Sequence, residues 1–173
     1  DLWRYRVNDS TWTWFSGSGI PTQPGLYGEK GNGSSENVPG SRQSAVVWYD
    51  SLREEFWLFG GKGYASTISS KCHLMLFNTN KLLNIQAIGN LNDLWLYRVN
   101  NDTWTWMAGS SEIDDLGQPG QKGTENIPGA RYGAFGYYDD ATGQLWLFGG
   151  HNEHHYNSHL CAHLCFRVST YNP

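Results

Sequence analysis

The sequence predicts an all-β protein, and its composition and an internal repeat are the observations behind this prediction. Nine Trp and ten Tyr stand against two Met, and the chain has 21 Gly but only 16% charged residues. Aromatic residues favour strands and glycines favour tight turns, so the composition indicates short strands joined by turns rather than long amphipathic helices. With 173 residues, 39% of them hydrophobic, the chain has enough apolar material for a core.

A segment at the start of the chain returns in its middle. DLWRYRVNDSTWTW at 1–14 and DLWLYRVNNDTWTW at 93–106 match at eleven of fourteen positions without a gap. Three later landmarks recur in the same order, namely QPG at 23 and 118, ENVPG at 36 against ENIPG at 125, and FWLFGG at 56 against LWLFGG at 145. The first block repeats after 92 residues and the last after 89, so we expect conserved strands and loops of variable length.

Each repeat unit predicts four short strands. The first strand is SAVVWYD at 44–50 in one unit and YGAFGYYD at 132–139 in the other. The FWLFGG or LWLFGG run is the second, DLWxYRV the third and TWTW the fourth. Turns rich in Asn, Asp and Gly separate the first strand from the second and the third from the fourth, which predicts two hairpins per unit.

Aromatic residues alternate along the third and fourth strands. Trp95, Tyr97 and Val99 share one face of the third strand, and Trp104 and Trp106 share one face of the fourth. Aromatic faces of this kind could also stack on sugars or bases. Because the positions repeat from unit to unit at strand periodicity, we interpret them as core packing.

The order aromatic strand, LFGG, NDLW with Tyr two residues later, then TWTW resembles the kelch repeat. The resemblance covers most of the chain and fails at about 72–89 and after about 153. It implies a β-propeller built of four-stranded antiparallel blades. Such rings close with about four to eight blades, and this chain would supply about two, so we expect a partial propeller with an incomplete ring. Either a longer parent chain or an assembly of several copies would complete it.

On this interpretation the chain divides into blade segments and connections. These are the third and fourth strands of a first blade at 1–14, a long loop at 15–43, a full blade at 44–107 with an insert at 71–89, a second loop at 108–130, and a partial blade with an irregular tail at 131–173. The insert has neither clean alternation nor turn residues. Two explanations stay open: translated unspliced or misannotated sequence, which would also apply to the tail, or a genuine lid-like insertion.

Histidines and cysteines gather near the C-terminal end. Imidazole and thiolate groups suit zinc or copper, but their spacing here fits no standard zinc motif. We therefore expect no metal and no other cofactor, and a metal site remains the weaker alternative for His151, His155, His159, Cys161, His163 and Cys165. A nucleophile elbow, a phosphate-binding loop and a paired acid and base are all missing from the sequence, which favours a protein that is not an enzyme.

The charge pattern narrows the class of partner. The net charge is −4 and the 12 Lys and Arg residues are scattered, so no concentrated basic surface for nucleic acid is expected. No apolar run is long enough to cross a bilayer. We expect a protein partner, or alternatively a glycan, and the sequence leaves the compartment open.

The long connections predict where a partner would bind. In a four-stranded antiparallel blade the connection between the second and third strands and the connection to the next blade emerge on the same side. Functional residues concentrate on such loops. We predict contact residues from loop position and side-chain chemistry: Tyr27, Lys30, Lys62, Tyr64, His151 and Asn152. The alternative is that these residues only pack and cap the loops.

Arg42 and Arg131 also repeat, each after a PG turn. We interpret them as scaffold residues that pair with Asp1 and Asp93 at a strand end. The function that the resemblance implies is a non-enzymatic binding module. Two alternatives stay open: a segment of a copper-dependent carbohydrate or alcohol oxidase of the galactose oxidase type, whose Tyr and His metal ligands find no match here, and a structural spacer in a repetitive surface protein.

Overall fold

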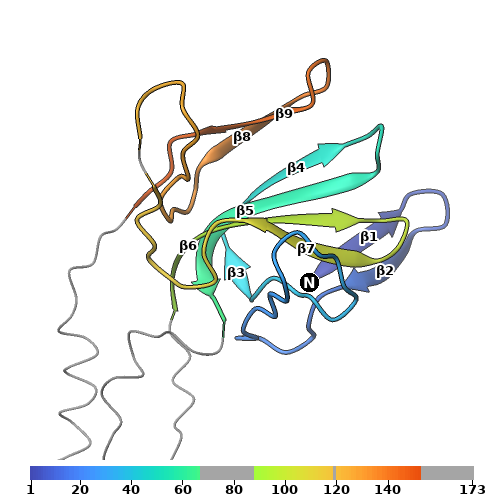
Figure 1. The fold of residues 1–173 in the computed structure, drawn as a ribbon. Helices are drawn as coiled ribbons and strands as arrows, with labels where there is room; N and C mark the ends of the chain where they lie inside the picture. Colours follow the sequence, from blue (N-terminus) through green and yellow to red (C-terminus); the bar gives the residue numbers. More distant parts are fainter. Residues whose placement is uncertain (67–87, 119, 153–173) are drawn as a thin grey trace, which may run out of the picture.

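The computed structural model describes residues 1–66, 88–118 and 120–152, and within them the protein consists of antiparallel strands without a helix (Figure 1). These residues form nine strands in three sheets. The predicted all-β class is therefore confirmed. The described strands form no closed ring, so the propeller arrangement stays a prediction.

Five strands form the central sheet. They are β3 (Arg42–Gln43), β4 (Val46–Asp50), β5 (Glu55–Tyr64), β6 (Ile88–Arg98) and β7 (Thr103–Ala108). From β4 to β7 the strands follow one another as an antiparallel meander, and β3 lies along the far end of β5. The four strands that the sequence predicts between residues 44 and 107 are thus present in the predicted order.

Strands β5 and β6 are longer than their sequence motifs. β6 begins at Ile88, and Ile88 and Gly89 pair with Tyr64 and Gly63 of β5. β6 thus includes Ile88 and Gly89, the last two residues of the predicted insert 71–89, because backbone pairing with β5 does not need side-chain alternation. The part of the insert at 71–87 lies outside the described residues.

Two further hairpins flank the central sheet. They are β1 (Leu2–Arg6) with β2 (Thr11–Ser16), and β8 (Phe135–Asp139) with β9 (Gln144–Phe148). The register of β1 on β2 copies that of β6 on β7, including the irregularity after the first pair. The register of β8 on β9 likewise copies that of β4 on β5. The flanking hairpins therefore correspond to the two halves of the central sheet.

The two hairpins cover opposite faces of the central sheet, as the fanned arrangement in Figure 1 shows. On one face Val46, Trp48 and Phe59 pack against residues of β8 and β9. A Cβ on Gly136 of β8 would lie 2.6 Å from Trp48 Nε1, so only a glycine allows this approach. Trp48 Nε1 also donates a hydrogen bond to the carbonyl oxygen of Trp146 at 3.2 Å.

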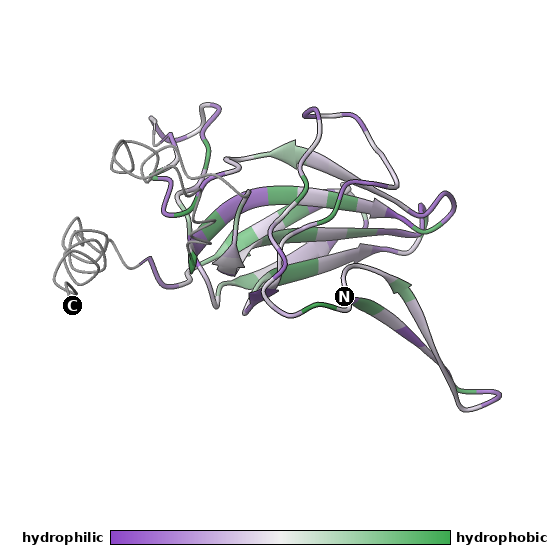
Figure 2. Ribbon diagram, turned by 90° about the horizontal axis from the view of Figure 1, so that it is seen from below, coloured by the Kyte–Doolittle hydropathy of each residue, from purple (hydrophilic) through white to green (hydrophobic). Residues whose placement is uncertain are grey.

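An aromatic cluster fills the other face. Tyr27, Trp95, Tyr97 and Trp104 are buried there, and Trp106 packs on them. This confirms the packing interpretation for the central sheet. The matching residues of the β1–β2 hairpin are exposed instead, by between 44% and 65%: Trp3, Tyr5, Trp12 and Trp14. Figure 2 shows this hairpin, which starts at the N-terminus, projecting from the rest of the molecule.

The connection from β2 to β3 lies along the outer edge of β7. Gly31 N donates to the carbonyl oxygen of Trp106 at 2.8 Å, and Ser34 N donates to that of Trp104 at 3.2 Å. The side-chain amide of Asn37 donates to the same Trp104 oxygen at 3.1 Å. The connection thus supplies hydrogen-bond donors to the outer edge of β7, which among the described strands has a neighbour only on its other side.

Candidate functional site

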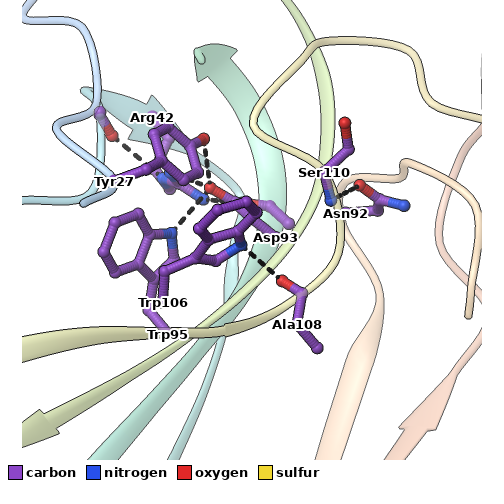
Figure 3. Close-up of polar contacts among 10 residues, drawn as sticks. Tyr27, Arg42, Asn92, Asp93, Trp95, Trp106, Ala108 and Ser110 are labelled. Atoms are coloured by element: carbon purple, nitrogen blue, oxygen red, sulfur yellow. Dashed lines mark hydrogen bonds and ion pairs between the residues drawn. The ribbon is translucent and has the colours of Figure 1, made fainter. Parts of the chain in front are cut away.

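A buried ion pair holds the end of the central sheet (Figure 3). Arg42 donates from Nη1 and Nη2 to the two carboxylate oxygens of Asp93, at 2.6 and 2.8 Å. Asp93 Oδ2 also accepts from the Tyr27 hydroxyl and from Trp95 Nε1, each at 2.7 Å. The side chain of Asp93 is fully buried and that of Arg42 is 6% exposed. The predicted pairing of Arg42 with Asp93 is confirmed.

The electrostatics of this cluster keep Tyr27 and Arg42 each in one charge state. Burial raises the pKa of Tyr27, and the neighbouring negative charge of Asp93 raises it further. Burial lowers the pKa of Arg42, but the charge and hydrogen bonds of Asp93 outweigh it and raise that pKa above its ordinary value. Tyr27 is therefore a neutral donor and Arg42 a permanent cation, a combination suited to scaffolding and not to proton transfer.

The position of Tyr27 corrects one predicted contact residue. Its side chain is only 6% exposed and its ring packs on Trp95, with ring centroids 4.9 Å apart. Tyr27 was predicted as a contact residue because it lies in a loop, but its side chain points inward from the connection to reach Asp93. Tyr27 is a core residue.

Arg131 repeats the backbone contacts of Arg42. Its Nε and Nη1 donate to the carbonyl oxygens of Gly129 and Gly149, each at 3.0 Å. Arg42 makes the matching bonds to Gly40 and Gly60, also at 3.0 Å. Within the described ranges no carboxylate contacts the Arg131 guanidinium, so its predicted pairing with an aspartate is not made inside this chain.

Asp1 presents the opposite half of that arrangement. Its Oδ2 accepts a hydrogen bond from Trp3 Nε1 at 2.7 Å, as Asp93 does from Trp95. No arginine contacts Asp1 in the part of the chain that the structure describes. Asp1 and Arg131 are therefore each one half of the kind of ion pair that Arg42 and Asp93 form in the central sheet.

A cluster of three residues, of which His151 is exposed and Lys62 and Tyr132 are half-buried, lies where the central sheet meets the connection into β8. Lys62 Nζ stands 5.5 Å from the centroid of the Tyr132 ring. The ring of Tyr132 contacts that of His151 edge-on, with centroids 5.4 Å apart. Two backbone hydrogen bonds join Tyr132 and His151, at 3.1 and 2.8 Å. We call these residues the Lys62–Tyr132–His151 cluster.

In this cluster two predicted contact residues, Lys62 and His151, both contact Tyr132, for which the sequence predicts a strand position. Tyr132 was placed at the start of the strand 132–139, whereas β8 begins at Phe135. The sequence signal that could have identified Tyr132 is its position directly after Arg131, the counterpart of Arg42. The connection from β7 also packs at this end of the sheet, since Asp114 N donates to the Asn90 carbonyl oxygen at 2.8 Å.

The other predicted contact residues lie in different settings. Asn152 is exposed and follows His151 directly. Tyr64 is half-buried at the end of β5, where its N–H donates to the Ser41 carbonyl oxygen at 3.0 Å. Lys30 is held away from them, because its Nζ donates to the Gly109 carbonyl oxygen at 2.9 Å and lies 4.2 Å from the Trp106 ring. Lys30 is itself exposed and joins its own connection to the one that follows β7.

A cavity of about 250 Å³ separates the β1–β2 hairpin from the central sheet. Such a cavity leaves no signal in the sequence, because it arises from the spacing between two sheets. Its lining includes residues of both, namely Asp1, Leu2, Ser41, Arg42, Val47 and Phe56.

The alternative metal site falls mostly outside the described residues. His151 is exposed, while His155, His159, Cys161, His163 and Cys165 lie beyond the described ranges. Among the described residues no three His, Cys, Asp or Glu side chains gather closely enough to hold a metal ion. The same residues contain no helix with the length and apolar content to span a membrane.

No family model, curated protein or solved structure matches this chain. The kelch resemblance therefore rests on the sequence motifs alone.

Proposed function

We propose that the protein is a binding module, part of a kelch-type propeller that presents loop residues to a protein partner and performs no catalysis. The observation that carries this proposal is the Lys62–Tyr132–His151 cluster. It combines a cation, an aromatic ring and an imidazole at the junction of two sheets, and aromatic side chains such as tyrosine are typical anchors of protein interfaces.

The scaffold beneath the cluster supports a binding role. Lys62 belongs to β5, and the carbonyl oxygen of Arg131, next to Tyr132, accepts from Gly61 N at 2.9 Å. Backbone hydrogen bonds therefore hold the three side chains at fixed spacing before a partner arrives. Preorganisation of this kind lowers the entropy cost of association. The expected ligand is a peptide segment with an apolar side chain that packs against the ring of Tyr132.

The experiment is selection of peptides from a random displayed library on the immobilised protein, followed by affinity measurement in solution. Lys62→Ala and His151→Ala should each weaken binding of the selected peptides by at least about fivefold, since anchor residues contribute more than about 1 kcal/mol. Lys122→Ala is the matched control, because Lys122 is an exposed loop lysine away from the cluster, and it should leave the affinity unchanged.

Two outcomes would contradict the proposal. One is a selected peptide whose affinity is the same for Lys62→Ala, His151→Ala and the unchanged protein. The other is stoichiometric bound copper together with turnover of an alcohol, which would favour the oxidase alternative.

A further inference from the structure

The central sheet provides a template for joining the two flanking hairpins. In it β5 pairs with β6 in a fixed register, with Phe59 opposite Leu94 and Trp57 opposite Leu96. The flanking strand β9 corresponds to β5, and β1 corresponds to β6, by sequence motif and by the register of their own hairpins. A strand of the β1 type therefore fits the edge of a strand of the β9 type.

Within the ranges that the structure describes, both of these strands have an open edge. Among the described residues β9 pairs only with β8, and β1 pairs only with β2. An unpaired edge with its N–H and C=O groups free is a template for another strand. Within one copy the two hairpins lie on opposite faces of the central sheet, so β9 does not reach β1 of the same copy.

We propose that a second copy of this chain completes each sheet: β1 of one copy pairs antiparallel with β9 of another, which forms a four-stranded sheet β8–β9–β1–β2. The register copied from the central sheet places Phe148 opposite Leu2, Trp146 opposite Arg4 and Gln144 opposite Arg6. This inference rests on strand pairing and is independent of the proposed binding of peptides.

An ion pair between the two copies fits the same arrangement. Arg131 is already oriented by the carbonyl oxygens of Gly129 and Gly149, and Asp1 is oriented by Trp3. In the central sheet the matching Arg42 and Asp93 form a bidentate pair. Pairing of β1 with β9 in the copied register brings Arg131 of one copy to Asp1 of the next.

Exposed apolar residues on the β8–β9 hairpin and on β4 also indicate that a second copy of the chain covers these surfaces. The outer face of β8–β9 exposes large side chains by 58% to 79%: Phe135, Tyr137, Trp146 and Phe148. On the other copy Val47 of β4, which lines the cavity next to β1–β2, is 57% exposed, and Tyr49 of the same strand is 45% exposed. An incoming β8–β9 hairpin would cover these residues with its own exposed face, just as the central sheet covers Leu145 and Leu147.

The contact is head-to-tail, so the number of copies follows from closure. Each copy contributes its central sheet and one shared sheet. Heterologous contacts form a ring when the rotation closes, and propeller rings typically hold about four to eight sheets, which corresponds to about two to four copies.

The test is sedimentation of the full chain over a range of concentrations, with charge reversals at the proposed ion pair. The unchanged protein should form a defined oligomer of two to four copies. Arg131→Glu and Asp1→Arg should each raise the dissociation constant by at least about 30-fold, because a like-charge contact replaces a buried pair. The double variant carrying both reversals should recover association, since the charges are then exchanged.

Matched controls and contrary outcomes are available. Lys122→Glu and Glu36→Arg make the same charge changes on exposed loops and should leave association unchanged. Recovery in the double variant excludes misfolding as the cause of the single losses. A chain that stays monomeric at every concentration would overturn the proposal, and so would an oligomer that is insensitive to both single reversals.

Discussion

The buried carboxylate of Asp93 joins the central sheet to a long connection. It accepts hydrogen bonds from Arg42, Tyr27 and Trp95, so the donors come from β3, from the connection between β2 and β3, and from β6 itself. Burying a charge is costly unless it is paired and hydrogen-bonded, and here the pairing is bidentate. The Asp93 carboxylate therefore anchors the connection between β2 and β3 to the central sheet.

Removal of Arg42 should be strongly destabilising. Arg42→Ala leaves the Asp93 carboxylate buried without its cation, and loss of one partner of a buried pair costs about 3–5 kcal/mol. The free energy of unfolding can be measured by urea titration followed by tryptophan fluorescence.

Arg131→Ala provides the control for this measurement. Arg131 makes the same two backbone hydrogen bonds, but within the described chain it contacts no carboxylate. We expect a loss of about 1 kcal/mol for the monomer, typical of hydrogen bonds without a buried charge. Equal losses for the two variants would show that the ion pair contributes nothing beyond its backbone contacts.

At the scale of the elements, the join between β4 and β8 holds the third sheet in place. Asp50 at the end of β4 accepts hydrogen bonds from Arg53 and from Tyr138 of β8, and together these lower the pKa of Asp50 to about 2. The same carboxylate accepts from Leu52 N at 2.9 Å and from Arg53 N at 3.1 Å. One side chain thus fixes a turn and an inter-sheet contact.

Stability should fall in acid because of this join. The folded-state pKa of Asp50, about 2, lies below the unfolded value of about 3.9, so the stabilisation is fully present above about pH 4. It is lost as the pH falls from about 4 to about 2. Tyr138→Phe removes one donor and raises the folded-state pKa, so the unfolding free energy of this variant should depend less steeply on pH across that window.

Tyr137→Phe is the neighbouring control, because Tyr137 points to the exposed face of β8 and is 58% exposed. Its pH dependence should match that of the unchanged protein. Identical acid profiles for Tyr138→Phe and Tyr137→Phe would contradict the assigned role of Tyr138.

The strands could be predicted from the sequence because side-chain alternation and the internal repeat involve residues that are close together in the chain. Trp95 and Tyr97 are buried as their two-residue spacing predicts. Tyr27 could not be assigned, since its burial depends on Asp93, 66 residues away. Lys62 and His151 were selected separately, and only the stacking of two sheets reveals that Tyr132 joins them.

At the scale of the whole molecule, packing is uneven. The central sheet has neighbours on both faces, whereas each flanking hairpin has one covered face and one exposed face. A two-stranded hairpin alone is marginally stable in water. The flanking hairpins should therefore open more readily than the sheet between them.

Amide hydrogen exchange at low protein concentration should reveal this gradient. Amides of β5 and β6 should exchange at least about 100-fold more slowly than those of β1 and β9, because local opening needs less free energy at the hairpins. Raising the concentration should then protect β1 and β9 selectively if copies associate. Uniform protection along all strands at low concentration would contradict the gradient.

The connection that borders β7 also determines where the chain can accept foreign sequence. Leu26 pairs with Val38 as Gln118 pairs with Ile127, so Gly120 corresponds to Gly28 and not to the Gly25 of the QPG motif. The stretch between Gly28 and Asn37 holds eight residues and that between Gly120 and Asn126 holds five, which accounts for the change in repeat offset from 92 to 89. The longer stretch donates hydrogen bonds to β7, so a peptide grafted there would remove partners from a sheet edge. The shorter one is exposed and mostly bonded to itself. A tag or recognition peptide inserted at Gly123 would leave the sheets intact, and this makes that loop the natural attachment point for a probe.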